Sequence, residues 1–244
     1  MINISAVSYL NTMPLIYGLN HGVFSKEINL SLDYPSKCAD KFKNREVDVA
    51  LVPVVIMREL TYFNIISDYC IGSDGVVETV CLYSDVPIQQ VENIYLDYQS
   101  RTSIELLKLL LKDYWDLSPN LISSEVGFED NITAKNAGLV IGDRAFFLNT
   151  KYNFVYDLSY FWKKMTGLPF VFAVWLSNKE LSDHFISGFN NAMGFGLNNL
   201  DQVLVRENYN YFNCNNPKDY LENKISYSLD ERKIEAMRYF LDKL

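Results

Sequence analysis

The sequence has few of the residues that build metal sites, disulfide frameworks and anion-binding surfaces. Its four cysteines include no CxxC pair, and only two histidines are present to complete a zinc site. This argues against a structural metal or a disulfide framework, and it predicts small buried cysteines in a reducing compartment. Lysine and arginine number 22 against 30 aspartates and glutamates, a net charge of -8. A broad basic face for nucleic acid or anionic lipid is therefore excluded, and an anionic partner must be bound at one local site.

Long apolar runs and the motifs of several enzyme classes are also missing. No segment reaches the ~18 uninterrupted apolar residues of a membrane helix. Residues 1–7 lack the basic and long apolar regions of a secretory signal, so we expect a soluble, cytoplasmic protein. The chain has no GxSxG, HExxH, GxGxxG or P-loop motif. Serine hydrolases, zinc proteases and nicotinamide enzymes therefore have no support.

What the sequence does have is ample material for a core. It has 244 residues, of which 49% are hydrophobic and 14% aromatic. A globular chain of this length buries roughly 70 to 75% of its unfolded surface, which excludes global disorder. At about 150 residues per domain, one large domain and two small ones are both open.

Short β-rich segments alternate with helical ones along the chain. Several strand candidates are near-continuous apolar runs, which is the pattern of strands buried on both faces of a parallel or mixed sheet. The candidates are residues 2–7, 30–34, 47–52, 65–71, 76–83, 94–96, 139–141 and 170–176. Capping-box spacings at residues 102–105, 177–180 and 228–231 predict three helix starts, the first helix ending near Tyr114. The order predicts an α/β protein with a helical C-terminal third.

Two segments are typical of crossings between lobes. The strand at 76–83 runs toward Pro87, which cannot extend a central strand, and the strand at 170–176 leads directly into a capped helix. Between them lie about 90 residues with strands and helices of their own, near the lower end of the domain range. We therefore expect a discontinuous first lobe of residues 1–84 and 177–244 and an inserted second lobe of residues 85–176. A ligand would bind in the cleft between them.

Polar residues directly after the first strand form the first candidate site. Tyr9, Leu10 and Asn11 follow that strand, and in open α/β sheets ligands gather at the carboxyl ends of strands. The Asn11 side chain offers both a donor and an acceptor, while Pro14 suits the first turn of a following helix. The alternative is that Asn11 or Thr12 merely caps that helix.

A polar cluster at a helix start forms the second candidate site. Ser100, Arg101, Thr102 and Ser103 bring together hydroxyls, a guanidinium and the free N–H groups of a helix N-terminus. This combination binds carboxylate or phosphate. An N-cap role accounts for Thr102 but leaves the clustering of the others unexplained, so we expect an anion site here.

Three further residues complete the candidates. Thr79 follows a glycine-bounded turn, and strand alternation places it on the face opposite to Glu78. A hydroxyl at that position suits a cleft wall, although Thr is also an ordinary strand residue. Gly142 and Asp143 stand between a strand end and a predicted helix. Asp143 fits either a general base or an N-cap, and capping is the commoner use of that position.

Taken together, these motifs resemble the chorismate dehydratase family of the futalosine route to menaquinone. They recur in order along most of the chain, and the run Gly167-Leu168-Pro169-Phe170-Val171-Phe172-Ala173-Val174-Trp175 is the most distinctive. The other matching segments are residues 8–15, 74–79, 100–103, 141–143 and 162–166. The resemblance implies a two-lobed periplasmic-binding-protein-like fold of type II. Mixed sheets flanked by helices would then hold the ligand in the interlobe cleft.

The resemblance also implies a reaction, the cofactor-free loss of water from chorismate to give 3-[(1-carboxyvinyl)oxy]benzoate. No metal, nucleotide or nicotinamide is required, because this dehydration is redox-neutral. The functional asparagine of the family corresponds to Asn11, and its functional hydroxyl corresponds to Thr79, where Ser is more frequent. Neither side chain is a general base at neutral pH, so we expect them to orient the substrate and polarise its departing hydroxyl.

The remaining roles follow from the substrate, which is a small dicarboxylate. One of its carboxylates fits the helix start at 100–103. The predicted substrate-binding residues are Tyr9, Leu10, Ser100, Arg101, Thr102, Ser103, Gly142 and Asp143. The hypothesised base is the enolpyruvyl carboxylate of the substrate, with Asp143 or Glu78 as the alternatives in the protein.

Two other functions stay open at this point. The sister enzyme of the same pathway, 1,4-dihydroxy-6-naphthoate synthase, shares the fold. Its Ser-Pro-Cys-Pro-Asn signature is absent here, and residues 8–12 stand in its place. The other is a noncatalytic binding or sensing protein for an aromatic carboxylate, since this architecture is widely used for binding alone. Residues 208–224, rich in Asn and Tyr, are assigned no function, and the sequence does not indicate an oligomeric state.

Overall fold

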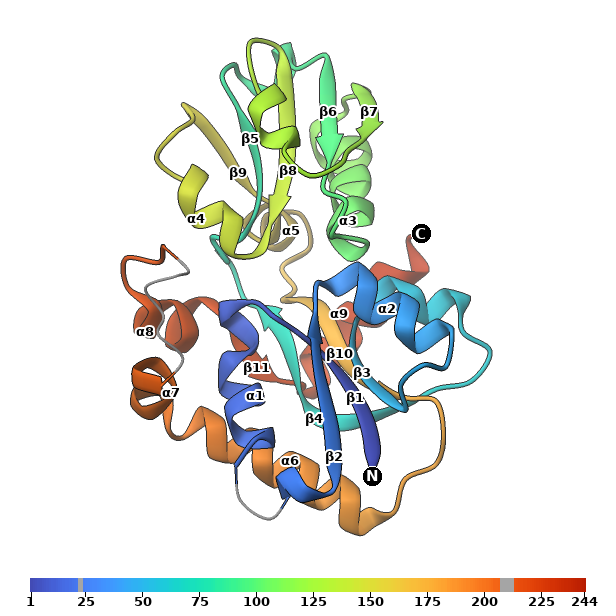
Figure 1. The fold of residues 1–244 in the computed structure, drawn as a ribbon. Coiled ribbons are helices and arrows are strands. Elements are labelled where there is room, and N and C mark those ends of the chain that lie inside the picture. The colour runs from blue at the N-terminus through green and yellow to red at the C-terminus, as the bar shows by residue number, and fades with distance from the viewer. Residues whose placement is uncertain (22–23, 207–212) are drawn as a thin grey trace.

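The computed structural model describes residues 1–21, 24–206 and 213–244, whose strands form two sheets (Figure 1). The first sheet contains β1 (Ile2–Val7), β2 (Ile28–Asp33), β3 (Val49–Pro53), β4 (Asn64–Ser73), β10 (Phe170–Ser177) and β11 (Ser226–Ser228). The second contains β5 (Val80–Ser84), β6 (Asn93–Leu96), β7 (Asn120–Ser123), β8 (Asn136–Ile141) and β9 (Phe154–Asp157). Their strand orders are β11-β4-β10-β3-β1-β2 and β7-β6-β8-β5-β9.

Helices flank both sheets. They are α1 (Met13–Leu19), α2 (Pro35–Lys43), α3 (Thr102–Leu110), α4 (Ala145–Leu148), α5 (Leu158–Thr166), α6 (Asp183–Leu197), α7 (Leu200–Arg206), α8 (Pro217–Asp219) and α9 (Glu231–Asp242). In Figure 1, α1 and α6 pack together on one side of the first sheet, while α2 lies on the other side against β1 and β3. None of the helices in the described part of the chain combines the length and hydropathy that crossing a bilayer takes.

Both sheets are mixed, as the near-continuous apolar runs predicted. β1 pairs in parallel with β2 and β3, whereas β10 runs antiparallel to β3 and β4. Every residue of β3, β5 and β10 is buried. Strands that are covered on both faces have no polar side to present, and this explains why their sequences do not alternate.

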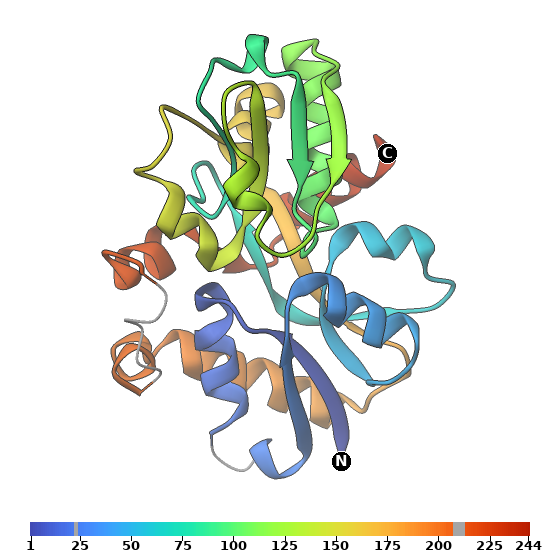
Figure 2. The ribbon, with the colours of Figure 1, turned by 45° about the horizontal axis from the view of Figure 1, so that its top comes forward.

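The chain passes between the sheets at two adjacent places. Residues 74–79 lead from β4 into β5, and residues 167–169 lead from α5 into β10. Phe170 pairs with Ser73, so the two crossings lie side by side, as Figure 2 shows. We call residues 1–73 and 170–244 the first lobe and residues 80–166 the second lobe.

The predicted boundaries at 84/85 and 176/177 assign β5 and β10 to the wrong sheets. β5 pairs with β8 and β9 of the second sheet, and β10 pairs with β3 and β4 of the first. The proline and the predicted cap that set those boundaries mark where elements end. Sheet membership depends instead on partners that are remote in sequence. That the two lobes behave as separate domains stays a proposal.

Two predicted capping boxes are also wrong in position. α6 begins after Ser182, whose hydroxyl accepts a hydrogen bond from the N–H of Phe185 at 3.2 Å. α9 begins after Asp230, whose carboxylate accepts the N–H of Lys233 at 2.9 Å. In both places a cap residue further along the chain supplies the acceptor that the first N–H groups of a helix need.

Candidate functional site

A cavity lies where the two lobes and their crossings meet. Most of the predicted site residues line it, namely Tyr9, Asn11, Thr79, Ser100, Arg101, Thr102, Ser103 and Gly142. Apolar walls come from Val7, Ile71, Val77 and Phe172, among others. In the part of the chain that the structure describes, Arg101 is the one charged residue in this lining. The cavity therefore has two polar ends: an amide–hydroxyl end, Asn11 and Thr79, and a helix-start end, residues 100–103.

Asn11 is fixed at its backbone and at its side chain. It lies in a 3-10 turn, Leu10–Thr12, between β1 and α1, and it does not cap α1 with its side chain. The Thr12 hydroxyl donates to Oδ1 of Asn11 at 3.0 Å, and the Tyr227 hydroxyl donates to the main-chain oxygen of Asn11 at 2.7 Å. These bonds use the amide oxygen and the main-chain oxygen, so the amide N–H groups are the donors that the Asn11 side chain offers.

Thr79 is buried and lies just before β5 rather than within a strand. The preceding residue, Glu78, has a φ of 66°. The Asp157 carboxylate accepts the N–H groups of Val77 and Glu78 at 2.8 and 2.7 Å, and so holds this turn. The prediction that Thr79 and Glu78 alternate along one strand was therefore wrong. Its result stands, because Thr79 lines the cavity while the Glu78 carboxylate pairs with Lys224 at 3.1 Å.

Tyr220 is a residue of this site that sequence reasoning missed. Its hydroxyl lies 2.7 Å from the Thr79 hydroxyl, and the nearby Asn11 side chain favours its ionised form. Burial raises the pKa of this phenol well above its ordinary value, so the group keeps its proton. Tyr220 belongs to residues 208–224, of which 208–212 lie outside the described residues. A single tyrosine in an Asn- and Tyr-rich stretch carries no local signal that could have found it.

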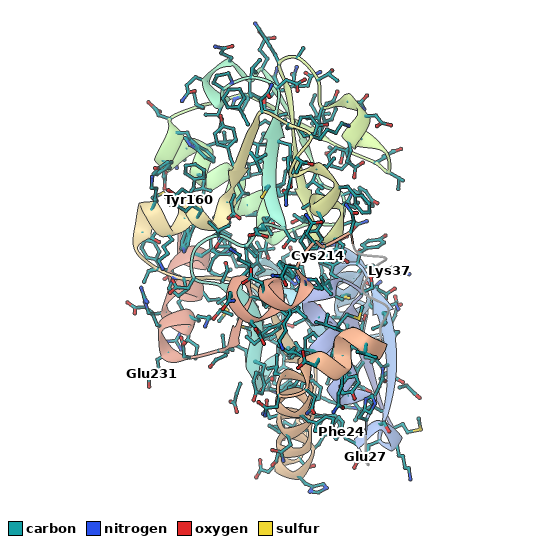
Figure 3. The ribbon with its side chains drawn as sticks, turned by 90° about the vertical axis from the view of Figure 1, so that its left-hand side faces the viewer. Phe24, Glu27, Lys37, Tyr160, Cys214 and Glu231 are labelled. Carbon is teal, nitrogen blue, oxygen red and sulfur yellow. The ribbon has the colours of Figure 1, made fainter. Side chains whose placement is uncertain are left out.

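The segment of the first lobe that carries Tyr220 lies against the second lobe. It comprises residues 213–224 and contains α8 followed by a π-helical turn, Tyr220–Lys224. Figure 3 shows Cys214, near its start, at the level where the lobes meet. The Tyr220 ring packs edge-on against Phe146 of the second lobe, with ring centroids 5.1 Å apart. The segment therefore lies behind Thr79 at the amide–hydroxyl end of the site.

The helix-start end is built differently from its prediction. The Ser100 hydroxyl, rather than Thr102, accepts the N–H of Ser103, at 3.2 Å. The Thr102 hydroxyl donates to the main-chain oxygen of Phe172 at 3.1 Å. The guanidinium of Arg101 forms an ion pair with Asp40, which is half exposed. What remains for an anion is the open first turn of α3 together with a partly neutralised Arg101.

Direct contacts close the lobes over the cavity. The Leu10 N–H donates to both oxygens of the Asp143 carboxylate, at 3.0 and 3.2 Å, and the Tyr9 hydroxyl donates to the side chain of Gln99. Gly142 has a φ of 68°, and a Cβ there would lie 2.5 Å from the Tyr9 ring. Glycine at this position therefore permits both the turn and the close approach of the lobes.

Leu10 and Asp143 thus have a different position from the one predicted. Neither lines the cavity, and the Asp143 side chain does not cap the helix that follows it. The two residues bind each other across the lobes. Burial raises the pKa of Asp143 to about 7, which the hydrogen bond from Leu10 partly offsets. The capping prediction failed because the strand end turns Asp143 toward the other lobe.

A menaquinone biosynthesis family matches this chain over residues 2–244. The chain belongs to this family. A chorismate dehydratase from Thermus thermophilus is 31% identical to it over 219 residues, which are 82% of this chain and 79% of that relative. In the described residues of this family member, no group of three or more His, Cys, Asp or Glu side chains is placed to hold a metal ion.

Solved structures confirm the fold predicted for this menaquinone biosynthesis family member. A protein from Archaeoglobus fulgidus superposes with a TM-score of 0.79 at 16% identity, covering 99% of this chain and 95% of that one. A Candida albicans protein described as having the generic periplasmic binding protein fold gives 0.67 at 12% identity, over 100% and 89% of the two chains. The ligand-binding component of an ABC-type import system from Staphylococcus aureus gives 0.64 at 13% identity, over 99% and 91%.

Proposed function

We propose that this protein is a chorismate dehydratase, a lyase that removes water from chorismate without a cofactor and forms 3-[(1-carboxyvinyl)oxy]benzoate at the start of the futalosine route. One observation carries the proposal. A single interlobe cavity places an amide and a hydroxyl at one end and an open helix start with Arg101 at the other. The family and the relative from Thermus thermophilus support the choice of substrate.

The helix-start end binds one carboxylate of the substrate. The first N–H groups of α3 and the positive end of its dipole favour an anion, and Arg101 adds a charge-assisted hydrogen bond. The chain as a whole carries a net charge of -8, which repels a dianion elsewhere on its surface. This local anion site sets the orientation of the substrate ring, because only one end of the cavity attracts a carboxylate.

The base in this mechanism is the enolpyruvyl carboxylate of the substrate. Among the described residues, none that lines the cavity is Asp, Glu, His or Lys. Of the two alternatives, Asp143 is bound to the Leu10 N–H and Glu78 is paired with Lys224. The apolar walls remove water from the substrate carboxylate, which raises its basicity.

The elimination then needs little from the protein beyond positioning and hydrogen bonds. The C3 proton passes to the substrate carboxylate, the C3–H electron pair forms the new ring double bond, and the C4–O bond breaks. The carboxyl group then returns the proton to the departing hydroxide, which leaves as water. Asn11 and Thr79 stabilise the negative charge that develops on the departing oxygen, which is the kind of term that preorganised donors supply. Formation of the aromatic ring drives the reaction forward.

We also place this reaction in the cytoplasm. Cys38, Cys70 and Cys81 are buried and free, and burial raises the pKa of the Cys38 thiol to about 11 and that of Cys70 to about 12. Thiols of this kind behave as small hydrophobic side chains, which fits a reducing compartment.

The test is to mix the purified protein with chorismate alone. We expect the ultraviolet spectrum to change to that of a substituted benzoate, and the product mass to be one water lower, with and without a metal chelator. Tight binding of chorismate without turnover would show that this protein binds chorismate and does not convert it. Asp143→Asn and Glu78→Gln should each keep kcat within about threefold, because neither is the base; a collapse of kcat in either would identify the base instead.

A further inference from the structure

One buried tyrosine joins the two side chains of the amide–hydroxyl end. Tyr220 is 2% exposed, its hydroxyl is hydrogen-bonded to Thr79, and the Asn11 side chain is near enough to influence its pKa. Tyr220 does not line the cavity itself. It therefore touches both groups that face the substrate without touching the substrate.

The direction of these hydrogen bonds follows from counting donors. Oδ1 of Asn11 already accepts from the Thr12 hydroxyl, and the N–H groups of Asn11 are its donors toward neighbours such as the Tyr220 oxygen. Either hydroxyl can donate across the 2.7 Å between Tyr220 and Thr79; a Tyr220 oxygen that faces an amide N–H leaves its single proton for Thr79. The Thr79 oxygen accepts this proton, which leaves its own O–H free to point elsewhere.

The chain of bonds therefore runs from amide to phenol to hydroxyl and ends at the cavity. The one other acceptor within reach of the Thr79 hydroxyl is the main-chain oxygen of Val77, at a long 3.4 Å, among the bonds of the described residues. Hydrogen bonds that run in one direction polarise one another and strengthen the last donor. The Thr79 O–H thus becomes a better donor than an isolated hydroxyl.

We propose that Tyr220 is a positioning residue for the dehydration: its hydroxyl fixes the Thr79 O–H as a donor aimed at the departing hydroxyl of the substrate. The inference rests on the proposed function and names a residue that the reaction needs beyond Asn11 and Thr79. Its effect falls on the transition state, because the charge on the departing oxygen develops only as the C4–O bond breaks.

The experiment compares Tyr220→Phe with a matched control, Tyr83→Phe. Both changes remove one buried phenol oxygen and keep the ring. The Tyr83 hydroxyl donates to Asn149 at 2.6 Å and to the main-chain oxygen of Ala145 at 3.2 Å, away from the cavity lining. We expect Tyr220→Phe to lower kcat about tenfold with KM within about twofold, and Tyr83→Phe to leave both constants unchanged at a similar loss of stability.

A double-mutant cycle separates positioning from a general structural effect. In a Thr79→Val background, Tyr220→Phe should change kcat by less than about twofold, because the hydroxyl that it positions is gone. Equal kcat for Tyr220→Phe and Tyr83→Phe, a rise in KM alone, or additive losses in the cycle would each overturn the role of Tyr220. Wild-type protein that does not turn over chorismate would overturn the proposed function first, and this inference with it.

Discussion

The two polar ends of the cavity are built on opposite principles. The amide–hydroxyl end is neutral and buried, and each of its side chains is hydrogen-bonded to a buried partner before any substrate arrives. The helix-start end carries a charge, and its Arg101 is already paired with a half-exposed Asp40. The first end is preorganised, whereas the second must exchange one partner for another when substrate binds.

The difference between the two ends indicates that one end acts mainly in the chemical step and the other mainly in substrate binding. Donors that cost no reorganisation act best on charge that develops during the reaction, so the amide–hydroxyl end should govern kcat. An exposed ion pair contributes only ~0 to 1 kcal/mol and is easily exchanged, so the helix-start end should govern KM. Variants at the two ends separate these two roles.

Asn11→Ala removes the amide from the preorganised end. We expect kcat to fall about 1,000-fold with little change in KM, since the loss of one such donor costs about 100- to 1,000-fold and Tyr220 also loses its donor. Steady-state turnover of chorismate measures it. Asn93→Ala is the control, because Asn93 bonds other asparagines on β6, β7 and β8, outside the cavity lining. Unchanged turnover in Asn11→Ala would refute the assignment of this end.

Thr79 offers a graded test of the same end. Thr79→Val keeps the shape but removes the hydroxyl, so kcat should fall about 100-fold. Thr79→Ser keeps the hydroxyl and its bond to Tyr220, so kcat should stay within about threefold. The matched pair separates the hydroxyl from the methyl group. If Ser and Val variants lost activity equally, packing rather than hydrogen bonding would explain the residue.

Two changes at the helix-start end should move KM in opposite directions. Arg101→Gln removes the charge and should raise KM about tenfold. Asp40→Asn frees Arg101 from its ion pair and should lower KM about twofold, more at low salt than at high salt. Lys135→Gln, at an exposed ion pair with Glu92 outside the cavity lining, is the control and should leave KM unchanged. A fall in kcat at constant KM would contradict the division.

The smallest effect on turnover should come from Asp143, whose influence is on stability. Its pKa of about 7 in the folded protein lies above the ordinary aspartate value, so the folded state holds a proton that the unfolded chain has lost between about pH 4 and 7. This stabilisation is complete below about pH 4 and disappears as the pH rises through about 7. From pH 5 to pH 8 the wild type should lose about 2 kcal/mol more unfolding free energy than Asp143→Asn.

Urea unfolding of both proteins at the two pH values measures that difference. Asparagine keeps an acceptor for the Leu10 N–H, so the comparison isolates the titration. Equal pH dependence of the two unfolding free energies would show that Asp143 does not hold a proton in the folded state.

Strands whose sequences are apolar because they are buried could be predicted from the sequence. Strands that form only because they pair with a neighbouring strand could not. β3 and β10 are nearly continuous apolar runs, and every one of their residues is buried. β7, β9 and β11 are four, four and three residues long, and β7 is mostly exposed. They are strands because a neighbouring edge offers hydrogen bonds, which no local pattern records.

The site divides in the same way. Asn11, Thr79 and residues 100–103 stand at strand ends and a helix start, where local signals and a family resemblance both point to function. Tyr220 reaches Thr79 across 141 positions of sequence, and Asp143 reaches Leu10 across 133. Contacts of that range are set by how the lobes pack, so the sequence predicted residues that line the cavity, but it missed Tyr220 and the contact that Asp143 makes with Leu10.

The lobes can approach each other at Gly142 and the Tyr9 ring only because glycine has no Cβ atom. A methyl group at position 142 would lie 2.5 Å from the Tyr9 ring, and this steric clash would hold the lobes apart. Water would then reach the substrate carboxylate and solvate it, and a solvated carboxylate is a poorer base. In the proposed mechanism, the basicity of the substrate carboxylate thus depends indirectly on the absence of a side chain at Gly142.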